Sequence, residues 1–155
     1  MNKYMKMAKD AAEENLNTKV GGPFGAVIVK KSDNGDEVVG IGSNRVITDS
    51  DPTAHAEITA IRNATKKLKT HDLSECELYT SCYPCPMCMS AIIWANIKTV
   101  YYGNTKEDAA ELGFRDDMIY RYFKSGESDI VNLKQVDRNE TIETFNKYKD
   151  QDGRV

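Results

Sequence analysis

The sequence has 155 residues, a length that predicts one domain with a sizeable buried core. It is 40% hydrophobic and 29% charged with a net charge of −3, which is typical of a globular protein and argues against the basic surface of a nucleic-acid-binding protein. No apolar run approaches the roughly 20 residues that a membrane span needs, and the N-terminus is too charged for a signal peptide. We therefore expect no membrane partner and a cytoplasmic protein with reduced cysteines.

The first predicted elements are a helix and a hairpin. Residues 1–17 place their apolar side chains on one helical stripe, and Gly21-Gly22-Pro23 ends that helix. The apolar, β-branched stretch 24–30 suits a buried strand. Asn34-Gly35 is a strong turn signal, which predicts a returning strand at 38–44.

Helices and strands then alternate. We expect a helix at 54–69, a strand at 77–81, a third helix at 86–97 and a strand at 99–103. The third helix is apolar nearly all round and is predicted to be buried. The signal weakens after Asn104, where the pattern indicates helices near 106–111 and 116–123, a strand near 130–136 and a final helix near 140–148.

This order predicts an α/β fold, a three-layer α-β-α sandwich with a mixed, mainly five-stranded sheet in a single domain of residues 1–155. Polar strand-to-helix junctions should meet at one edge of such a sheet, where open α/β sheets place their sites. Two junctions carry unusual chemistry: "DPTAHAEI" at 51–58 and "TSCYPCPMC" at 80–88.

The second junction concentrates thiols. Pro86 suits the first position of a helix, so Cys85 becomes the N-cap and Cys88 lies one turn further on, with both sulfurs facing one point. The helix dipole stabilises thiolate there, and two thiolates suit zinc. A Cys-x-x-Cys alone leaves three alternatives open: a redox pair, a zinc half-site or two buried cysteines.

The first junction offers a third ligand. His55 opens a helix and can donate an imidazole nitrogen, and three protein ligands leave one tetrahedral position open, as in catalytic zinc sites. Glu57 would then be a neighbouring base rather than a ligand. Taken singly, His55 can be a capping or core histidine, and Glu57 can simply complement the helix dipole. Together with the two cysteines, they favour zinc.

The residues "HAE" at 55–57 and "PCPMC" at 84–88 resemble the His-x-Glu and Pro-Cys-x-x-Cys signature of the cytidine and purine-base deaminases. Within this family the chain is most similar to the bacterial guanine deaminases. The similarity lies in the segments "GGPFGAVIVK", "SDPTAHAEITAIR", "TSCYPCPMC", "AIIWA" and "AELGFRDDMIY". The resemblance covers residues 1 to roughly 122, and it implies the cytidine-deaminase fold.

The resemblance implies hydrolysis of guanine to xanthine and ammonia. His55, Cys85 and Cys88 would bind one zinc ion per chain, and Glu57 would carry protons between water and substrate. The residues implied to contact the purine base are Phe24 and Trp94 as ring walls, Asn44 and the Ala56 backbone N–H at its polar edges, and Asp116 at the guanine face. Each has a structural alternative, in core packing or in turn and cap formation.

The match also has departures. Tyr83 stands where relatives carry an acidic residue. The relatives also end near a tyrosine that folds over the site, whereas this chain continues past Tyr148 into "KDQDGRV". The resemblance implies a homodimer, with residues 130–155 as a candidate segment for exchange between subunits. Rival functions are deamination of cytosine or another small base, deamination of adenosine in tRNA, and a structural zinc or redox role without catalysis.

Overall fold

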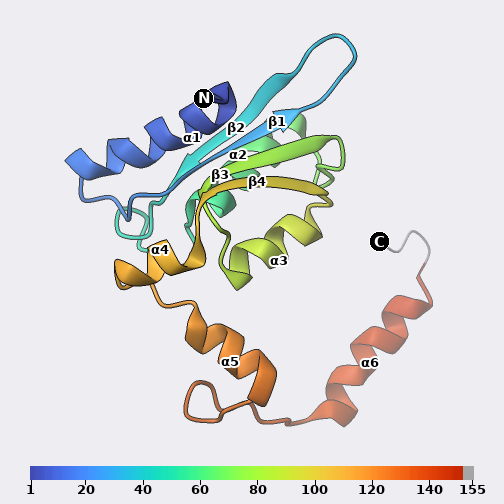
Figure 1. Cartoon of the computed structure of the whole chain (residues 1–155). Coiled ribbons are helices and arrows are strands. Elements are labelled where there is room, and N and C mark those ends of the chain that lie inside the picture. Colours follow the sequence, from blue (N-terminus) through green and yellow to red (C-terminus); the bar gives the residue numbers. More distant parts are fainter. Residues whose placement is uncertain (152–155) are drawn as a thin grey trace. The chain divides into compact units, whose positions relative to one another are not determined.

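The computed structural model describes residues 1–151, and it divides into two compact units that meet in sequence between Asp117 and Met118 (Figure 1). The first unit holds the sheet and the helices that cover it, and it carries every residue singled out as a candidate for chemistry. The second unit is helical. Residues 152–155, the last part of the expected exchangeable segment, lie outside the described residues.

The sheet is mixed, as predicted. Its strands are β1 (Gly25–Lys30), β2 (Glu37–Ser43), β3 (Cys76–Cys82) and β4 (Thr99–Asn104), in the order β2-β1-β3-β4. The β1–β2 hairpin is antiparallel, β1 and β3 are also antiparallel, and β3 and β4 are parallel. Parallel strands need a crossover, and the helix between β3 and β4 supplies it.

Helices cover both faces of the sheet, which confirms the three-layer sandwich (Figure 1). On one face α1 (Lys3–Glu14), followed by a short 3-10 turn at 15–17, packs Tyr4 and Ala8 against β1 and β3. On the other face lie α2 (Ala56–Leu68) and α3 (Pro86–Trp94). A short α4 (Lys106–Glu111) follows β4.

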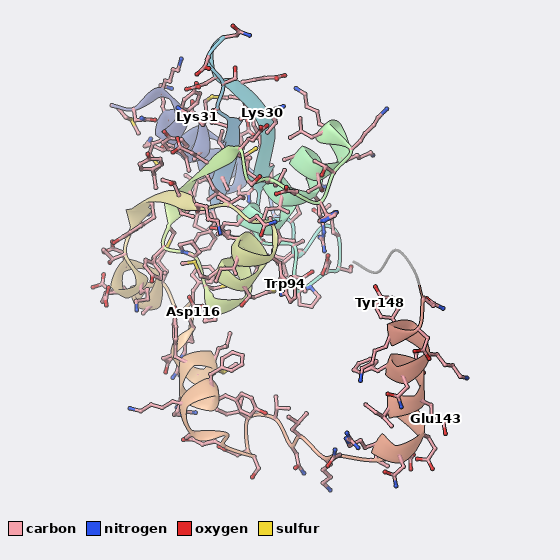
Figure 2. The ribbon with its side chains drawn as sticks, turned by 90° about the vertical axis from the view of Figure 1, so that its right-hand side faces the viewer. Lys30, Lys31, Trp94, Asp116, Glu143 and Tyr148 are labelled. Carbon is pink, nitrogen blue, oxygen red and sulfur yellow. The ribbon has the colours of Figure 1, made fainter. Side chains whose placement is uncertain are left out.

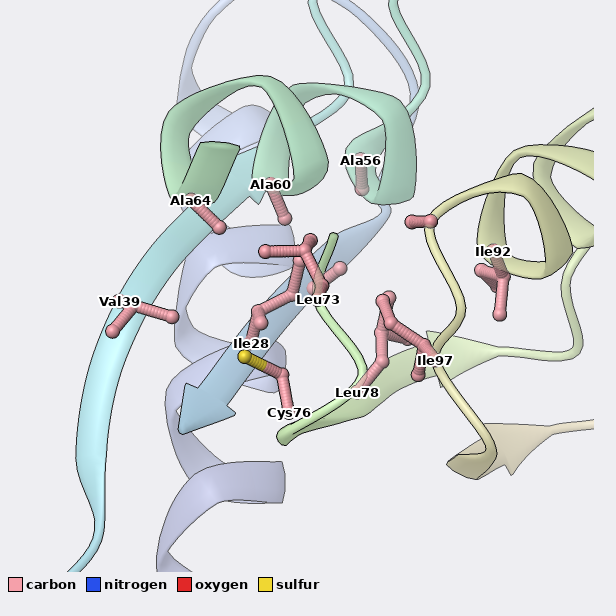
Figure 3. Close-up of a cluster of buried hydrophobic side chains, with 12 residues drawn as sticks. Ile28, Val39, Ala56, Ala60, Ala64, Leu73, Cys76, Leu78, Ile92 and Ile97 are labelled. Atoms are coloured by element: carbon pink, nitrogen blue, oxygen red, sulfur yellow. The ribbon is translucent and has the colours of Figure 1, made fainter. Parts of the chain in front are cut away.

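The larger core lies between the sheet and α2. Figure 3 shows Ile28, Leu73 and Leu78 meeting under Ala60 and Ala64 of α2. These side chains are at most 1% exposed, so each large one contributes about 1.5–3 kcal/mol of transfer free energy. The small alanine face lets α2 sit close to the strands.

Two glycines in β2 make this close approach possible. A Cβ at Gly40 would lie 2.5 Å from the Ala60 carbonyl oxygen, and one at Gly42 would lie 2.4 Å from the Ala56 carbonyl oxygen. Both distances are shorter than real Cβ contacts, so only glycine at these two positions lets α2 rest on the sheet, Gly42 under its first turn and Gly40 further along. The position of His55 and Glu57 therefore depends on these glycines.

The second unit is built from α5 (Asp117–Ser125) and α6 (Arg138–Lys149). The strand predicted near 130–136 is wrong: this stretch has no regular structure, and the sheet of the described residues has four strands rather than five. Its apolar residues Val131, Leu133 and Val136 are exposed, and no neighbouring strand pairs with this stretch among the described residues.

The predicted burial of α3 is also wrong. Only Cys88 and Ile92 of this helix are buried, whereas Ile93 is 68% and Trp94 is 82% exposed. Figure 2 shows Trp94 at the surface of the first unit. Among residues 1–151 no helix is both long and apolar enough to span a membrane.

Candidate metal and active site

The candidate donors stand at two helix N-termini. His55 is the N-cap of α2 and Cys85 is the N-cap of α3, and both residues have extended backbone conformations. Pro86 takes the first helical position of α3, where its missing N–H costs nothing. The Cys85 sulfur accepts the backbone N–H of Cys88 at 3.5 Å, which caps the helix with the thiol itself.

The three donor atoms converge. Nδ1 of His55 lies 3.6 Å from Sγ of Cys85 and 3.5 Å from Sγ of Cys88. Tetrahedral zinc, with bonds of about 2.3 Å to sulfur and 2.0–2.1 Å to nitrogen, requires an N···S separation of about 3.6 Å. The donor set and its spacing therefore fit zinc with three protein ligands. Among the His, Cys, Asp and Glu side chains of residues 1–151, His55, Cys85 and Cys88 form the group that could hold a metal ion.

The local charges favour a cation. The pKa of the Cys85 thiol is lowered, because the Cys88 thiol donates a hydrogen bond to it and because His55 lies beside it. The same contact raises the pKa of the His55 imidazole, since a protonated ring is stabilised by the Cys85 thiolate. A metal ion can replace the positive charge of the protonated His55 ring, because zinc binds thiolate sulfur and neutral imidazole nitrogen.

Glu57 lies beside the donors without joining them. It is 5% exposed, in the first turn of α2, and its carboxylate lines the same cavity as His55 and Cys85. Its Oε1 accepts a hydrogen bond from the Thr80 hydroxyl at 2.5 Å. Glu57 is not part of the converging metal-donor group, so its carboxylate is available as a base.

The cavity has a volume of about 330 Å³, within the size range of small-molecule sites. One wall is aromatic: Phe24 and Phe114 meet edge to face, with ring centroids 4.8 Å apart. The remaining wall and rim residues are mostly apolar and include Val46, Ile47, Pro52, Cys82, Tyr83 and Ala109. An aromatic ring can pack against these walls.

Asn44 provides a polar edge. Its Oδ1 accepts the backbone N–H of Val46 at 3.1 Å, which leaves the amide N–H groups for a ligand. The buried Asn15 fixes the same loop, because its Nδ2 donates to the carbonyl oxygens of Gly22 at 2.8 Å and of Asn44 at 2.9 Å. Both residues that Asn15 holds line the cavity.

Asp116 provides an acidic edge (Figure 2). The carboxyl is half-buried, and burial, with a further contribution from Cys85, raises its pKa. The neighbouring Asp117 points elsewhere: it pairs with Arg115 at 3.1 Å and is 59% exposed. Of the two adjacent carboxylates, only Asp116 lines the cavity.

Two predicted substrate contacts lie outside the cavity lining. Trp94 is exposed at the end of α3, and within one chain it does not reach the cavity. Ala56 is the first helical residue of α2 and its side chain is fully buried, so the predicted contact of its backbone N–H with the base stays a prediction. The other predicted residues, Phe24, Asn44, His55, Glu57, Cys85 and Asp116, do line the cavity, and Cys88 joins the metal-donor group.

Sequence reasoning missed the aromatic cavity residue Phe114. Phe114 belongs to the segment "AELGFRDDMIY", so its proximity to Asp116 was the available signal. Tyr83 meets Tyr102 edge to face, at 5.0 Å between ring centroids, and Lys106 lies over its ring. Cys82 is buried beside the site, and burial raises the pKa of its thiol to about 11, so it stays protonated.

Comparisons with known proteins place this site in a family. The model of the cytidine and deoxycytidylate deaminase zinc-binding region matches residues 1–104. The guanine deaminase of Bacillus subtilis (strain 168) is 46% identical over 147 residues, which are 94% of this chain and 92% of that protein. A crystal structure of the guanine deaminase from Bacillus subtilis superposes with a TM-score of 0.91 and 42% identity, covering 100% of this chain and 98% of the other.

Other relatives share the core. A solved structure in complex with 2,6-diaminopurine has a TM-score of 0.67 and 35% identity, over 73% of this chain and 61% of that one. The tRNA-specific adenosine deaminase of Haemophilus influenzae is 40% identical over 93 residues, which are 60% of this chain and 52% of that protein. With its donor geometry and its matching zinc-binding region, the chain belongs to the cytidine and deoxycytidylate deaminase family.

Proposed function

We propose that the protein is a zinc-dependent guanine deaminase that converts guanine and water to xanthine and ammonia. The observation that carries the proposal is one cavity that is lined by two metal donors, by Glu57 and by Asp116 and that has one aromatic wall. The near full-length similarity to a guanine deaminase and the purine bound in a related structure support the choice of substrate.

Selectivity follows from hydrogen-bonding chemistry. Guanine presents adjacent N–H donors at N1 and at the exocyclic amine, and the Asp116 carboxylate accepts from both. Adenine has an acceptor at N1, and cytosine lacks the paired donors. A buried acceptor left unpaired costs about 1–3 kcal/mol, so we expect Asp116 to reject either base by about tenfold to a hundredfold.

The chain's own groups perform the proton transfers. Zinc, when bound, supplies a water of lowered pKa beside the substrate. Glu57 takes a proton from that water and delivers it to a ring nitrogen as oxygen bonds to the amine-bearing carbon. Glu57 then takes the remaining proton from the added hydroxyl group and delivers it to the amine, so that the carbonyl forms as the C–N bond breaks and ammonia leaves. Phe24 and Phe114 hold the ring, and Asn44 donates to its edge.

We also propose a cytoplasmic homodimer whose residues 1–155 form one enzyme domain and whose segment 130–155 exchanges between subunits. The four cysteines are free thiols, which suits a reducing compartment. Exposed apolar side chains on α3 and in the tail, including Trp94, Leu133 and Phe145, support a covering partner of the same chain.

The test is ammonia release by the purified, zinc-loaded protein against guanine, adenine, cytosine, cytidine and tRNA. We expect guanine to give the highest kcat/KM. Faster release from cytosine, cytidine or tRNA would overturn the proposal in favour of one of the other deaminase activities. A zinc-loaded protein that releases no ammonia from any of them would indicate a structural metal site.

A further inference from the structure

Thr80 makes a buried contact with the candidate base. This residue lies in β3, where it pairs with Ala26 of β1 and Tyr102 of β4, and its side chain is fully buried. Its hydroxyl oxygen is 2.5 Å from Oε1 of Glu57. An ionised carboxylate can only accept, so the hydroxyl donates, and a donor to a charged acceptor forms a short, strong hydrogen bond.

The hydroxyl has a second acceptor within reach. The carbonyl oxygen of Cys82 lies 3.0 Å from the Thr80 oxygen, and the Cys82 N–H approaches that oxygen at 3.5 Å. A hydroxyl carries one proton, so the shorter contact, which ends at the Glu57 carboxylate, takes it, and the Cys82 carbonyl is the alternative acceptor.

We propose that Thr80 is a positioning residue that fixes the Glu57 carboxylate for proton transfer. Glu57 sits in the first turn of α2 and Thr80 in the central sheet, so the hydrogen bond joins helix to sheet across the core. It engages Oε1 and leaves Oε2 as the oxygen that exchanges protons with water and substrate. The inference rests on the proposed role of Glu57 as the base and adds Thr80 as the residue that orients the Glu57 carboxylate.

The contact matters because a glutamate side chain is flexible. Misplacing a proton-transfer group by about 1 Å can cost on the order of a hundredfold in rate. Thr80 would act on the chemical step rather than on binding, since its hydroxyl is not among the cavity-lining groups. A purely structural threonine would instead be needed for its shape, because a β-branched side chain packs well in a central strand.

A matched pair of variants separates these roles. Thr80→Val keeps the shape and removes the hydroxyl, and Thr80→Ser keeps the hydroxyl and removes the methyl group. With zinc content verified for each, we expect Thr80→Val to lower kcat by about tenfold to a hundredfold with KM within about threefold, and Thr80→Ser to stay within about threefold of wild type. An unchanged kcat in Thr80→Val, or equal losses in both variants, would overturn the proposal.

A crystal structure of each variant gives a readout that needs no substrate. We expect the Glu57 carboxylate to rotate away from residue 80 in Thr80→Val and to stay in place in Thr80→Ser. An unmoved carboxylate in Thr80→Val would overturn the positioning role. If wild type prefers another base, the guanine proposal fails, and the same kinetic comparison is made on that base.

Discussion

Each candidate metal donor occupies a residue whose backbone is set by its own helix start. His55 and Cys85 are N-caps, a position at which the side chain points past the helix end toward whatever lies beyond it. Because both helices begin at the same edge of the sheet, two short local motifs are enough to build the site. This explains why His55, Cys85 and Cys88 could be predicted together from residue spacing.

Glu57→Gln separates a base from a ligand. The amide keeps the size of the side chain and can still accept from Thr80, but it cannot carry protons. We expect zinc content to stay at one per chain and turnover to fall by at least about a hundredfold, the usual scale of general acid–base help. Metal analysis and steady-state kinetics check this. Loss of zinc would show that Glu57 is a ligand, and near-native rates would exclude it as the proton carrier.

Asp116→Asn tests substrate recognition. We expect kcat/KM for guanine to fall by about tenfold or more with zinc retained, because an amide cannot accept from two adjacent donors. Asp117→Asn is the control, since Asp117 pairs with Arg115 on the surface and should leave turnover near wild type. Equal losses in the two variants, or a loss only in Asp117→Asn, would show that guanine recognition is not specific to Asp116.

The pKa of Asp116 gives this variant a second readout. Burial raises the folded-state pKa above the unfolded value, so the ionised carboxylate costs stability above the folded pKa, and the cost vanishes below the unfolded pKa. Asp116→Asn should therefore have a Tm at pH 7 equal to or above that of wild type, by calorimetry. A clear drop in Tm at pH 7 would mean that Asp116 stabilises the fold.

At the scale of elements, the contact between α2 and β2 controls the site. A Cβ at Gly42 would lie 2.4 Å from the Ala56 carbonyl oxygen, so Gly42→Ala must push away the helix start that carries His55 and Glu57. We expect a loss of about 1–3 kcal/mol in the free energy of unfolding, measured in urea, with weaker zinc retention. Ile41→Ala, at a partly exposed position of the same strand, is the control and should retain zinc.

The predicted elements succeeded where local pattern and tertiary packing agree. The strands of the hairpin have strong local signals and pair with neighbouring strands. The strand near 130–136 failed because a short stretch with several apolar residues cannot by itself supply a neighbouring strand. The prediction that α3 is buried was wrong because a helix that is apolar all round does not show which of its faces packs against the core. Trp94 lies on a face that does not pack against the core.

At the scale of the whole molecule, exposed apolar residues predict self-association. Ile93 on α3 is 68% exposed, and we expect wild type to sediment as a dimer at micromolar concentration. Ile93→Glu should weaken the dimer by about tenfold or more, because burying an unpaired charge is costly. Leu16→Glu, 69% exposed near the end of α1, is the control. A monomeric wild type, or equal behaviour of the two variants, would contradict the dimer.

The separation of the metal donors along the chain has a mechanical consequence. Cys85 and Cys88 follow His55 by 30 and 33 residues, and the chain between them contains α2 and β3. An ion held by all three is a crosslink that closes this loop. For a covalent link, closing a loop of that length restricts the unfolded chain by about 3–4 kcal/mol in the chain-entropy model. The bound metal thus links the N-termini of α2 and α3 at the sheet edge, and the cofactor that serves the reaction also stabilises the fold.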